Sequence, residues 1–449
     1  MRLLLGQFRD KTGIPSRQSL GTPVSGYPVN CNNIKGGWKM ADVSSAQERK
    51  PAKILLKDIA DQATQDAWDA KNRGEKIGWC ASNFPQEIPT TMGIPVVFPE
   101  NHGAAVSAKG GGQRMCEHAE NMGYSSDLCS YSRINFAYAE LKECPELNIP
   151  QPDFLLCCNN ICNCMIKWYE NLALELDIPL LLIDIPHLDG RECDTDRIRY
   201  IRAQFDDCIR ELEQITGKKW DEERFHEVME TSQRSSRAWL KAVDYMKYTP
   251  SPFSGFDIFN NMAVACVARG TVEGAEAFEQ LAEEYEENVN NGTSTFKAEE
   301  EFRVLFEGIA CWANLSYTFK TLKNMGINVT ATVYGPAFSF LYNNVDELMA
   351  AYSYVPNSNV FERETELRVT DAVKNKVEGA IFHMNRSCKH WSGNLYEMER
   401  QLREQAGIPT VVFDGDQSDP RVFSEAQYLT RVQGLVEIMA ANKRIGTGH

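Results

Sequence analysis

The sequence predicts an α/β protein with two lobes, each built on a buried parallel sheet, and a helical segment between them. Short apolar, β-branched runs repeatedly end in polar turns, and helix-period stretches separate them. Alternation of this kind is typical of βαβ units with a parallel sheet. The apolar runs lie at 94–98, 153–157, 179–184, 327–333, 379–383 and 408–413.

The remaining segments follow from composition and period. Residues 47–75 have apolar side chains at helical spacing, and 195–325 contains long charge-rich stretches with helical period, including 299–325. Residues 1–45 are rich in Gly, Pro, Ser and Asn without an apolar period, so we expect them to be disordered. The sequence therefore predicts domains at 46–194, 195–325 and 326–449.

The segment "KGGWKM" at 35–40 suggests a further hypothesis about the beginning of the chain. Its codons could form a bacterial ribosome-binding site just upstream of an initiation codon. Translation would then begin at Met40, and residues 1–39 would not be part of the native protein. Intact mass of the native protein tests this hypothesis.

The two lobes resemble each other in sequence, which predicts two Rossmann-like halves. "CCNNIC" (157–162) and "HMNRSC" (383–388) each follow a predicted strand, and each places Asn three residues before its last Cys. A helix pattern and a second strand ending in acid come next, with Asp184 in the first lobe and Asp414 and Asp416 in the second. Ligands of open parallel sheets bind beyond the carboxyl ends of the strands, so we expect Cys162 and Cys388 near a ligand.

Composition excludes several classes of function. The net charge of −15 argues against nucleic acid or an anionic membrane as the main partner, and no apolar run is long enough to span a bilayer. We therefore expect a cytoplasmic protein whose 14 cysteines are free thiols or metal ligands. P-loop, G-x-G-x-x-G, G-x-S-x-G and C-x-x-C motifs are absent from the sequence. "AKGGG" (108–112) is left only as a candidate phosphate contact.

Three cysteines are candidate metal ligands. Cys162 and Cys388 lie in polar turns at predicted helix starts, where the helix N-terminus favours a thiolate, and Cys129 lies in a third polar turn. Three separate turns match neither a zinc knuckle nor a contiguous ferredoxin motif, but they leave open a cubane iron–sulfur cluster with one exposed iron. The alternative is that a cysteine is a small buried hydrophobe. We expect that role for the remaining cysteines considered, and Cys164, two residues into its predicted helix, should point away from Cys162. They are Cys144, Cys157, Cys158, Cys164, Cys193, Cys208, Cys266 and Cys311.

Two polar side chains are candidate catalytic groups. Ser82 lies in the non-periodic stretch "GWCASNFPQEIP", and Glu100 directly follows a predicted strand in "FPENH". A hydroxyl and a carboxylate at strand ends could hydrogen-bond a ligand or transfer a proton. The alternative is that both cap helices. We expect structural roles for His102, His118, His187 and His383.

Five motifs in this order together resemble the 2-hydroxyacyl-CoA dehydratase family, which includes benzoyl-CoA reductase subunits. They are "GWCASNFPQE", "FPENH", "LLCCNNICN", "HMNRSCK" and "FDGDQSDPR". The chain looks like a dehydratase alpha subunit over 46–445. Two departures are Cys80, where a relative carries Ser, and the unmatched 45 N-terminal residues.

The resemblance implies a 4Fe-4S cluster in this subunit and another in a homologous beta subunit. Here the ligands would be Cys129, Cys162 and Cys388, with water or hydroxide on the fourth iron, and Ser82 and Glu100 would lie beside that iron. An ATP-dependent iron–sulfur activator protein would deliver one electron, which is recycled. A ketyl radical would then lose the α-hydroxyl to give (E)-2-enoyl-CoA.

The resemblance further implies that the substrate is (R)-phenyllactyl-CoA or another aryl or branched (R)-2-hydroxyacyl-CoA. The long insertion of the 2-hydroxyglutaryl enzymes before the strand at 153–157 is absent here, which counts against that substrate. The sequence leaves open whether a flavin also binds. Two alternatives are a benzoyl-CoA reductase-type subunit that reduces a ring, and an iron–sulfur electron carrier without catalysis.

Overall fold

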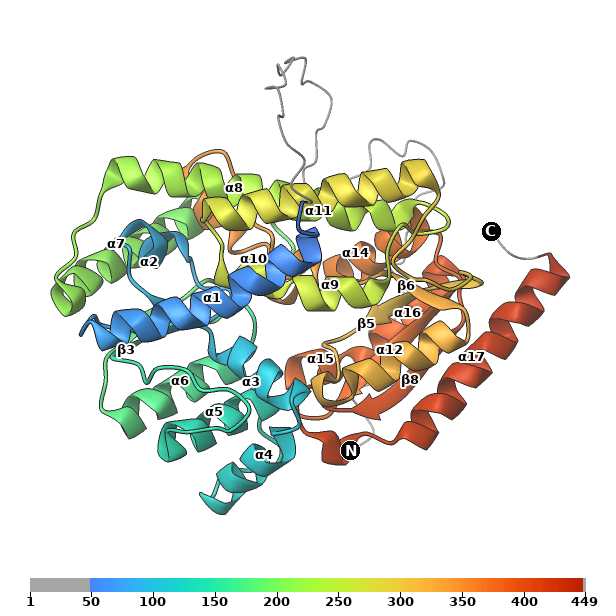
Figure 1. The fold of residues 1–449 in the computed structure, drawn as a ribbon, viewed down its shortest axis with the longest axis horizontal. Helices are drawn as coiled ribbons and strands as arrows, with labels where there is room; N and C mark the ends of the chain where they lie inside the picture. The colour runs from blue at the N-terminus through green and yellow to red at the C-terminus, as the bar shows by residue number, and fades with distance from the viewer. Residues whose placement is uncertain (1–48, 447–449) are drawn as a thin grey trace, which may run out of the picture. The chain divides into compact units, whose positions relative to one another are not determined.

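Two parallel four-stranded sheets organise residues 49–446, the part of the chain that the computed structural model describes (Figure 1). The expectations of disorder in residues 1–45 and of a start at Met40 lie outside the described residues. The described residues belong to one compact unit. Within them, every helix is too short or too polar to cross a lipid bilayer.

The two sheets have the same strand order, which confirms the prediction of two α/β lobes. The first sheet is ordered β2-β1-β3-β4 and the second β6-β5-β7-β8, so each lobe places its own first strand between its second and third. The first-lobe strands are β1 (Gly78–Cys80), β2 (Val96–Val97), β3 (Phe154–Cys158) and β4 (Leu180–Ile183). The second-lobe strands are β5 (Phe302–Glu307), β6 (Ile327–Ala331), β7 (Gly379–Asn385) and β8 (Thr410–Gly415).

Helices flank both sheets. Those between the strands of the first lobe and just after it are α2 (Glu87–Thr91), α3 (Pro99–Ala108), α4 (Gly112–Asn121), α5 (Ser130–Leu141), α6 (Asn163–Leu176) and α7 (Thr195–Thr216). Those of the second lobe are α12 (Leu315–Asn324), α13 (Val345–Ala351), α14 (Phe361–Lys374), α15 (Lys389–Gly393), α16 (Leu395–Ala406) and α17 (Glu425–Ile445). Helix α17 packs against β8 (Figure 1).

A helical layer separates the sheets in sequence. It consists of α8 (Glu222–Asp244), α9 (Gly255–Asn261), α10 (Ala263–Val267) and α11 (Val272–Asn291), and α1 (Ala52–Asn72) joins it. Helices α8 and α11 run side by side, and α1 packs against α11 (Figure 1). The helical expectations for 47–75 and for most of 195–325 are confirmed.

Two strands differ from the sequence expectation. Strand β5 occupies part of 299–325, which we expected to be helical, because its charged ends look solvent-exposed in sequence. In the structure both charges are buried and paired: Arg303 with Glu300, and Glu307 with Arg368 at 2.8 Å. Strand β1 is only three residues long, too short to give a period.

The inner strands β3 and β7 lead into the turns of the candidate site. Every residue of β3 and β7 is buried, as expected for inner strands of a parallel sheet covered on both faces. Their carboxyl ends deliver the chain directly into the turns that contain Cys162 and Cys388. The fold thus brings the two echoing turns of the sequence to equivalent positions in the two lobes.

Candidate functional site

Each of the three candidate cysteine ligands precedes a helix. Cys129, Cys162 and Cys388 are the N-cap residues of α5, α6 and α15, and none has helical backbone angles. All three line one cavity of about 350 Å³. The structure therefore gathers cysteines from three separate turns and two lobes at one place.

The cavity environment disfavours ionisation of these thiols in the absence of a cation. Burial raises the pKa of Cys162, and the Cys388 and Cys164 thiols add to the shift, whereas backbone N–H groups of Cys164 and Met165 oppose it. Burial likewise raises the pKa of Cys388 to about 11, against the N–H groups at the start of α15. Several thiolates at this place would require a positive charge among them.

Cys164 belongs to the site, contrary to the expectation that it points away as a packing residue. It lines the same cavity and forms a hydrogen bond with Cys129, which is the largest cause of the lowering of the Cys164 pKa. Side chains in the first turn of a helix tilt back toward the N-terminus. Cys164, two positions after Cys162, therefore still points toward the N-terminal end of α6.

Ser82 and Glu100 lie together in the wall of the same cavity. The backbone N–H of Ser82 donates to Glu100 Oε1 at 3.0 Å, whereas the Ser82 hydroxyl is buried and has no hydrogen-bond partner among the described residues. Burial raises the pKa of Glu100 to about 7. The pair thus offers an unused hydroxyl and a carboxyl group that can change its protonation state near neutral pH.

Aromatic and aliphatic side chains from the helical layer and the second lobe form much of the remaining wall. Sequence reasoning missed these residues, because they come from segments that meet only in the folded chain. They include Phe259, Met262, Trp312, Leu315, Tyr334 and Phe338. Such a wall suits an apolar organic group and keeps water away from reacting atoms.

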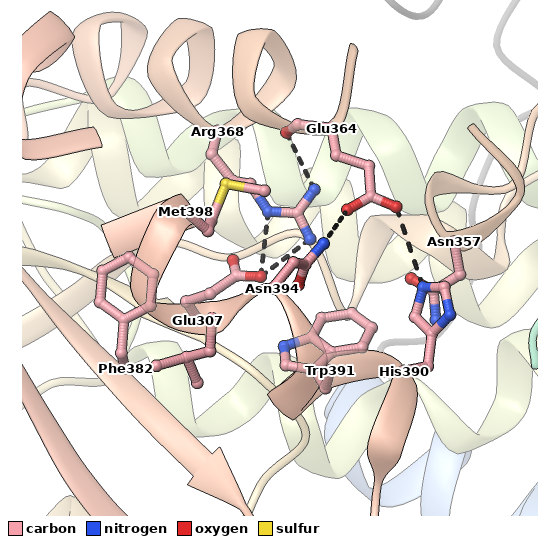
Figure 2. Close-up of a pocket in the computed structure, with 10 residues that line it drawn as sticks. Glu307, Asn357, Glu364, Arg368, Phe382, His390, Trp391, Asn394 and Met398 are labelled. Carbon is pink, nitrogen blue, oxygen red and sulfur yellow. Dashed lines mark hydrogen bonds and ion pairs between the residues drawn. The ribbon is translucent and has the colours of Figure 1, made fainter. Parts of the chain in front are cut away.

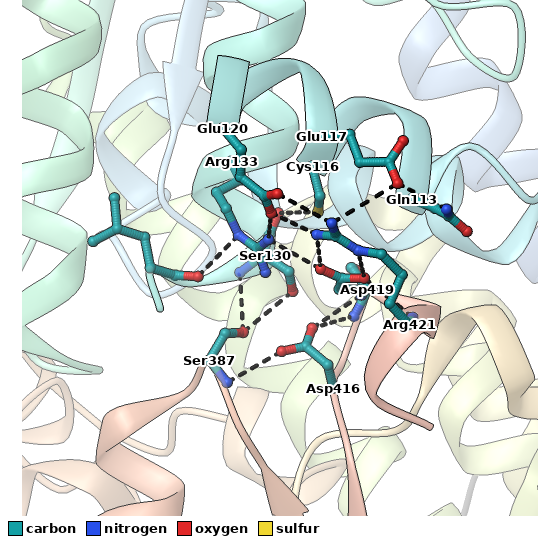
Figure 3. A network of polar contacts seen from close by, with 12 residues as sticks. Gln113, Cys116, Glu117, Glu120, Ser130, Arg133, Ser387, Asp416, Asp419 and Arg421 are labelled. Atoms are coloured by element: carbon teal, nitrogen blue, oxygen red, sulfur yellow. Dashed lines mark hydrogen bonds and ion pairs between the residues drawn. The ribbon is translucent and has the colours of Figure 1, made fainter. Parts of the chain in front are cut away.

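A buried polar network joins the two lobes beside the cysteines (Figure 3). The backbone N–H of Ser130 donates to Ser387 Oγ at 3.1 Å, which links the neighbours of Cys129 and Cys388. Arg133 Nη1 pairs with Asp419 Oδ2 at 3.0 Å across the same interface. These contacts fix the separation between cysteines of different lobes.

Helix α15, which begins after Cys388, is held by a second set of buried charges (Figure 2). Arg368 pairs with Glu307 and stacks on Trp391 at 5.7 Å, and Glu364 lies 3.8 Å from His390 Nε2. The cavity among these groups measures about 10 Å³, room for about one water molecule. We assign these buried charges the role of anchoring α15, and we assign no ligand to the small cavity among them.

The glycines of "AKGGG" have a packing role. A Cβ atom on Gly112 would lie 2.1 Å from the carbonyl oxygen of Ser418, so only glycine lets α4 approach the second lobe. Lys109 Nζ donates to the carbonyl of Glu146. These contacts account for the motif without a phosphate.

The donor set around the cavity fits an iron–sulfur cluster better than a single ion. Within residues 49–446, no three His, Cys, Asp or Glu side chains come close enough to hold one metal ion. Thiols at three helix starts around one cavity, with an unsatisfied serine hydroxyl in its wall, supply the soft sulfur donors that a multi-iron group requires. The assignment of Cys129, Cys162 and Cys388 as ligands stays a prediction.

Comparison with known proteins identifies the family. Residues 81–439 match the family described as 2-hydroxyglutaryl-CoA dehydratase, D-component. The chain belongs to this family. Relatives that are 41–58% identical to the chain are named as CoA dehydratases, which are hydro-lyases, and the expectation of an enzyme is confirmed.

Three relatives of this dehydratase-family chain are alpha subunits. The chain is 58% identical to the (R)-phenyllactyl-CoA dehydratase alpha subunit of Clostridium sporogenes, over 90% of this chain and 99% of the relative. It is 46% identical to the (R)-2-hydroxyisocaproyl-CoA dehydratase alpha subunit of Clostridioides difficile, with 89% and 99% covered. It is 42% identical to the (R)-2-hydroxyglutaryl-CoA dehydratase subunit alpha of Acidaminococcus fermentans (strain ATCC 25085 / DSM 20731 / CCUG 9996 / CIP 106432 / VR4), with 87% and 98% covered. The resemblance inferred from the five motifs is confirmed.

Proposed function

We propose that the chain is the alpha subunit of an (R)-2-hydroxyacyl-CoA dehydratase that converts an aryl or branched substrate, (R)-phenyllactyl-CoA above all, to the (E)-2-enoyl-CoA. The observation that carries the proposal is the convergence of Cys129, Cys162 and Cys388 with Ser82 and Glu100 on one apolar cavity. The 58% identity with a phenyllactyl-CoA dehydratase subunit, over 99% of that relative, supports the choice of substrate.

In this proposal the three cysteines hold a 4Fe-4S cluster through their thiolates. When bound, the cluster would supply an electron for the thioester carbonyl and one Lewis-acidic iron for the departing hydroxyl, because three cysteine ligands would leave the fourth iron without a thiolate. The N–H groups at the starts of α6 and α15 face the thiols of Cys162 and Cys388 and would stabilise their negative charge.

Ser82 and Glu100 would handle hydrogen bonds and protons around the substrate. The free Ser82 hydroxyl can donate to an oxygen atom placed in the cavity. Glu100, with its pKa raised to about 7, can hold or release a proton at its carboxyl group near neutral pH. The fixed bond from the Ser82 N–H keeps the Glu100 side chain in place while its protonation changes.

The apolar wall supports an aryl side chain on the substrate. Phe259 and Trp312 lie with their ring centroids 6.5 Å apart in an edge-on arrangement, and Phe338 packs edge-on against Tyr334 at 5.6 Å. Aromatic rings favour such edge contacts with another ring. A phenyl group in this part of the cavity would gain contacts that a charged glutaryl side chain could not.

Two protein partners follow from the proposal. The relatives are named as alpha subunits, which supports a homologous beta subunit carrying its own 4Fe-4S cluster. The chain contains no nucleotide-binding motif, so ATP hydrolysis would belong to a separate iron–sulfur activator protein.

Iron content and product analysis test the proposal. We expect Cys129→Ser, Cys162→Ser and Cys388→Ser to lose iron and activity under anaerobic purification, whereas Cys208→Ser, which alters a buried thiol of α7 outside the cavity, should retain both. Full iron content in any of the first three variants would refute that ligand.

Substrate trials separate the alternatives. A dehydratase converts (R)-phenyllactyl-CoA to an enoyl-CoA, whereas a benzoyl-CoA reductase-type subunit would reduce benzoyl-CoA instead. An electron carrier would bind neither thioester. Failure of the complex with its beta subunit and activator to convert any 2-hydroxyacyl-CoA would overturn the proposed function.

A further inference from the structure

A glutamine from the second lobe donates a hydrogen bond to a cysteine of the first. Gln417 lies just after β8, and its Nε2 is 2.9 Å from Cys129 Sγ. The Gln417 side chain is only 1% exposed, so water does not compete for this bond. Within residues 49–446, no other side-chain N–H donates a hydrogen bond to the sulfur of Cys129, Cys162 or Cys388.

The orientation of the Gln417 amide is determined by its surroundings. Asn385 Nδ2 donates to Gln417 Oε1, and the Asn385 side chain is fully buried at the end of β7. With its oxygen occupied by Asn385, the amide directs its nitrogen toward the sulfur. A thiolate can only accept hydrogen bonds, so the N–H orientation is also the one that the chemistry of Cys129 requires.

The loop that carries Gln417 is anchored on both sides. Asp416 Oδ1 accepts from the backbone N–H groups of Ser418 and Asp419 at 2.9 and 3.0 Å, and Asp416 Oδ2 accepts from Ser387 N at 3.1 Å (Figure 3). Arg133 then ties Asp419 to the first lobe. The contact between Gln417 and Cys129 is therefore held in place by the interface between the lobes.

We propose that Gln417 is a positioning residue that raises the reduction potential of the iron–sulfur cluster through its hydrogen bond to Cys129. The inference rests on the proposed function, because it requires the cluster. A reduced cluster carries one more negative charge than the oxidised one, and part of that charge lies on the cysteine sulfurs. An N–H donated to a sulfur stabilises the reduced form more, which is how such bonds tune clusters.

The test compares Gln417→Met with a matched control, Gln233→Met. Gln233 is also buried, but it lies in α8, does not line the cavity, and its amide atoms have no hydrogen-bond partner among the described residues. Methionine keeps the approximate length of glutamine and removes the N–H donor. The measurements are iron content and the midpoint potential of the cluster, followed by electron paramagnetic resonance in the anaerobic complex with the beta subunit.

We expect both variants to keep the iron of the wild type, and the midpoint potential of Gln417→Met alone to become more negative. Asn385→Leu, which releases the Gln417 amide without touching the sulfur, should shift the potential in the same direction by a smaller amount. If Gln417→Met does not fold, the midpoint potential of Asn385→Leu tests the proposal in its place.

Three results would overturn the inference. They are an unchanged potential in iron-loaded Gln417→Met, an equal shift in Gln233→Met, and loss of iron from a folded Gln417→Met chain. Loss of iron from this variant would mean that Gln417 helps to retain the cluster rather than to set its potential. Absence of iron from the wild type would instead refute the proposed function, so the two failures are distinguishable.

Discussion

Replacement of Glu100 by Gln should stabilise the chain at alkaline pH much more than at acidic pH. Burial raises the pKa of Glu100 from 4.5 to about 7, so between these values the folded state binds more protons than the unfolded state. The free energy of unfolding contributed by this group therefore falls as the pH rises through that window. Glutamine has the shape of glutamate and does not ionise, and its Oε1 can still accept from Ser82 N.

The magnitude follows from the two pKa values. Linkage over these values gives a penalty for ionised Glu100 of about 0.8 kcal/mol at pH 5 and about 3.3 kcal/mol at pH 8. The stability advantage of Glu100→Gln over the wild type should therefore grow by about 2.5 kcal/mol between the two pH values. Water in the cavity would reduce this figure, because a hydrated carboxylate is less destabilised.

Equilibrium unfolding in urea at pH 5 and pH 8 measures the difference. The control is Glu366→Gln, which alters an exposed glutamate of α14 and should change stability equally at both pH values. An advantage of Glu100→Gln that is the same at pH 5 and pH 8 would refute the reasoning. It would mean that the carboxyl group is solvated in the cavity and is not prepared for proton transfer near neutral pH.

Three further substitutions, with Gly434→Ala as a control, probe the interface and the cavity. Gly112→Ala should destabilise the chain by about 2 kcal/mol in urea unfolding, because its Cβ would lie 2.1 Å from a carbonyl oxygen of the other lobe. The control Gly434→Ala has open space around its Cβ in α17 and should stabilise the chain by about 0.5 kcal/mol. Arg133→Met should cost about 3 kcal/mol in the same assay, since it removes a buried partner of a buried carboxylate. Phe259→Ala should raise KM for (R)-phenyllactyl-CoA about tenfold with unchanged iron content, and an unchanged KM would place the aryl group elsewhere.

Sequence reasoning predicted those parts of the fold that have a strong local signal. Six apolar runs became strands because parallel strands are buried on both faces and read as continuous apolar segments. Strand β5 escaped prediction because Arg303 and Glu307 look solvent-exposed until their buried partners are known. Arg368, the partner of Glu307, lies in α14, and a single sequence does not pair these two residues.

Some residues of the candidate site could likewise be predicted from the sequence, and others could not. Cys162 and Cys388 could be found from the sequence because each turn follows a strand, and two such turns echo each other. Gln417 and Phe259 could not, since nothing local distinguishes a glutamine that meets a sulfur across an interface from one in solvent. Cys164 was expected to point away from Cys162 because it lies two residues into a helix, but side chains in the first turn of a helix tilt toward its start.

The order in which the cavity walls occur along the chain has a consequence for biosynthesis. Domains tend to fold N-terminal first as they leave the ribosome. The first sheet and the turns with Cys129 and Cys162 are complete by β4, whereas β7 and β8, which present Cys388 and Gln417, are among the last elements made. A cofactor that needs all three thiols can enter only after almost the whole polypeptide has been synthesised. Under the proposed function, the nascent first lobe would until then hold only two of the three thiols that bind the cluster.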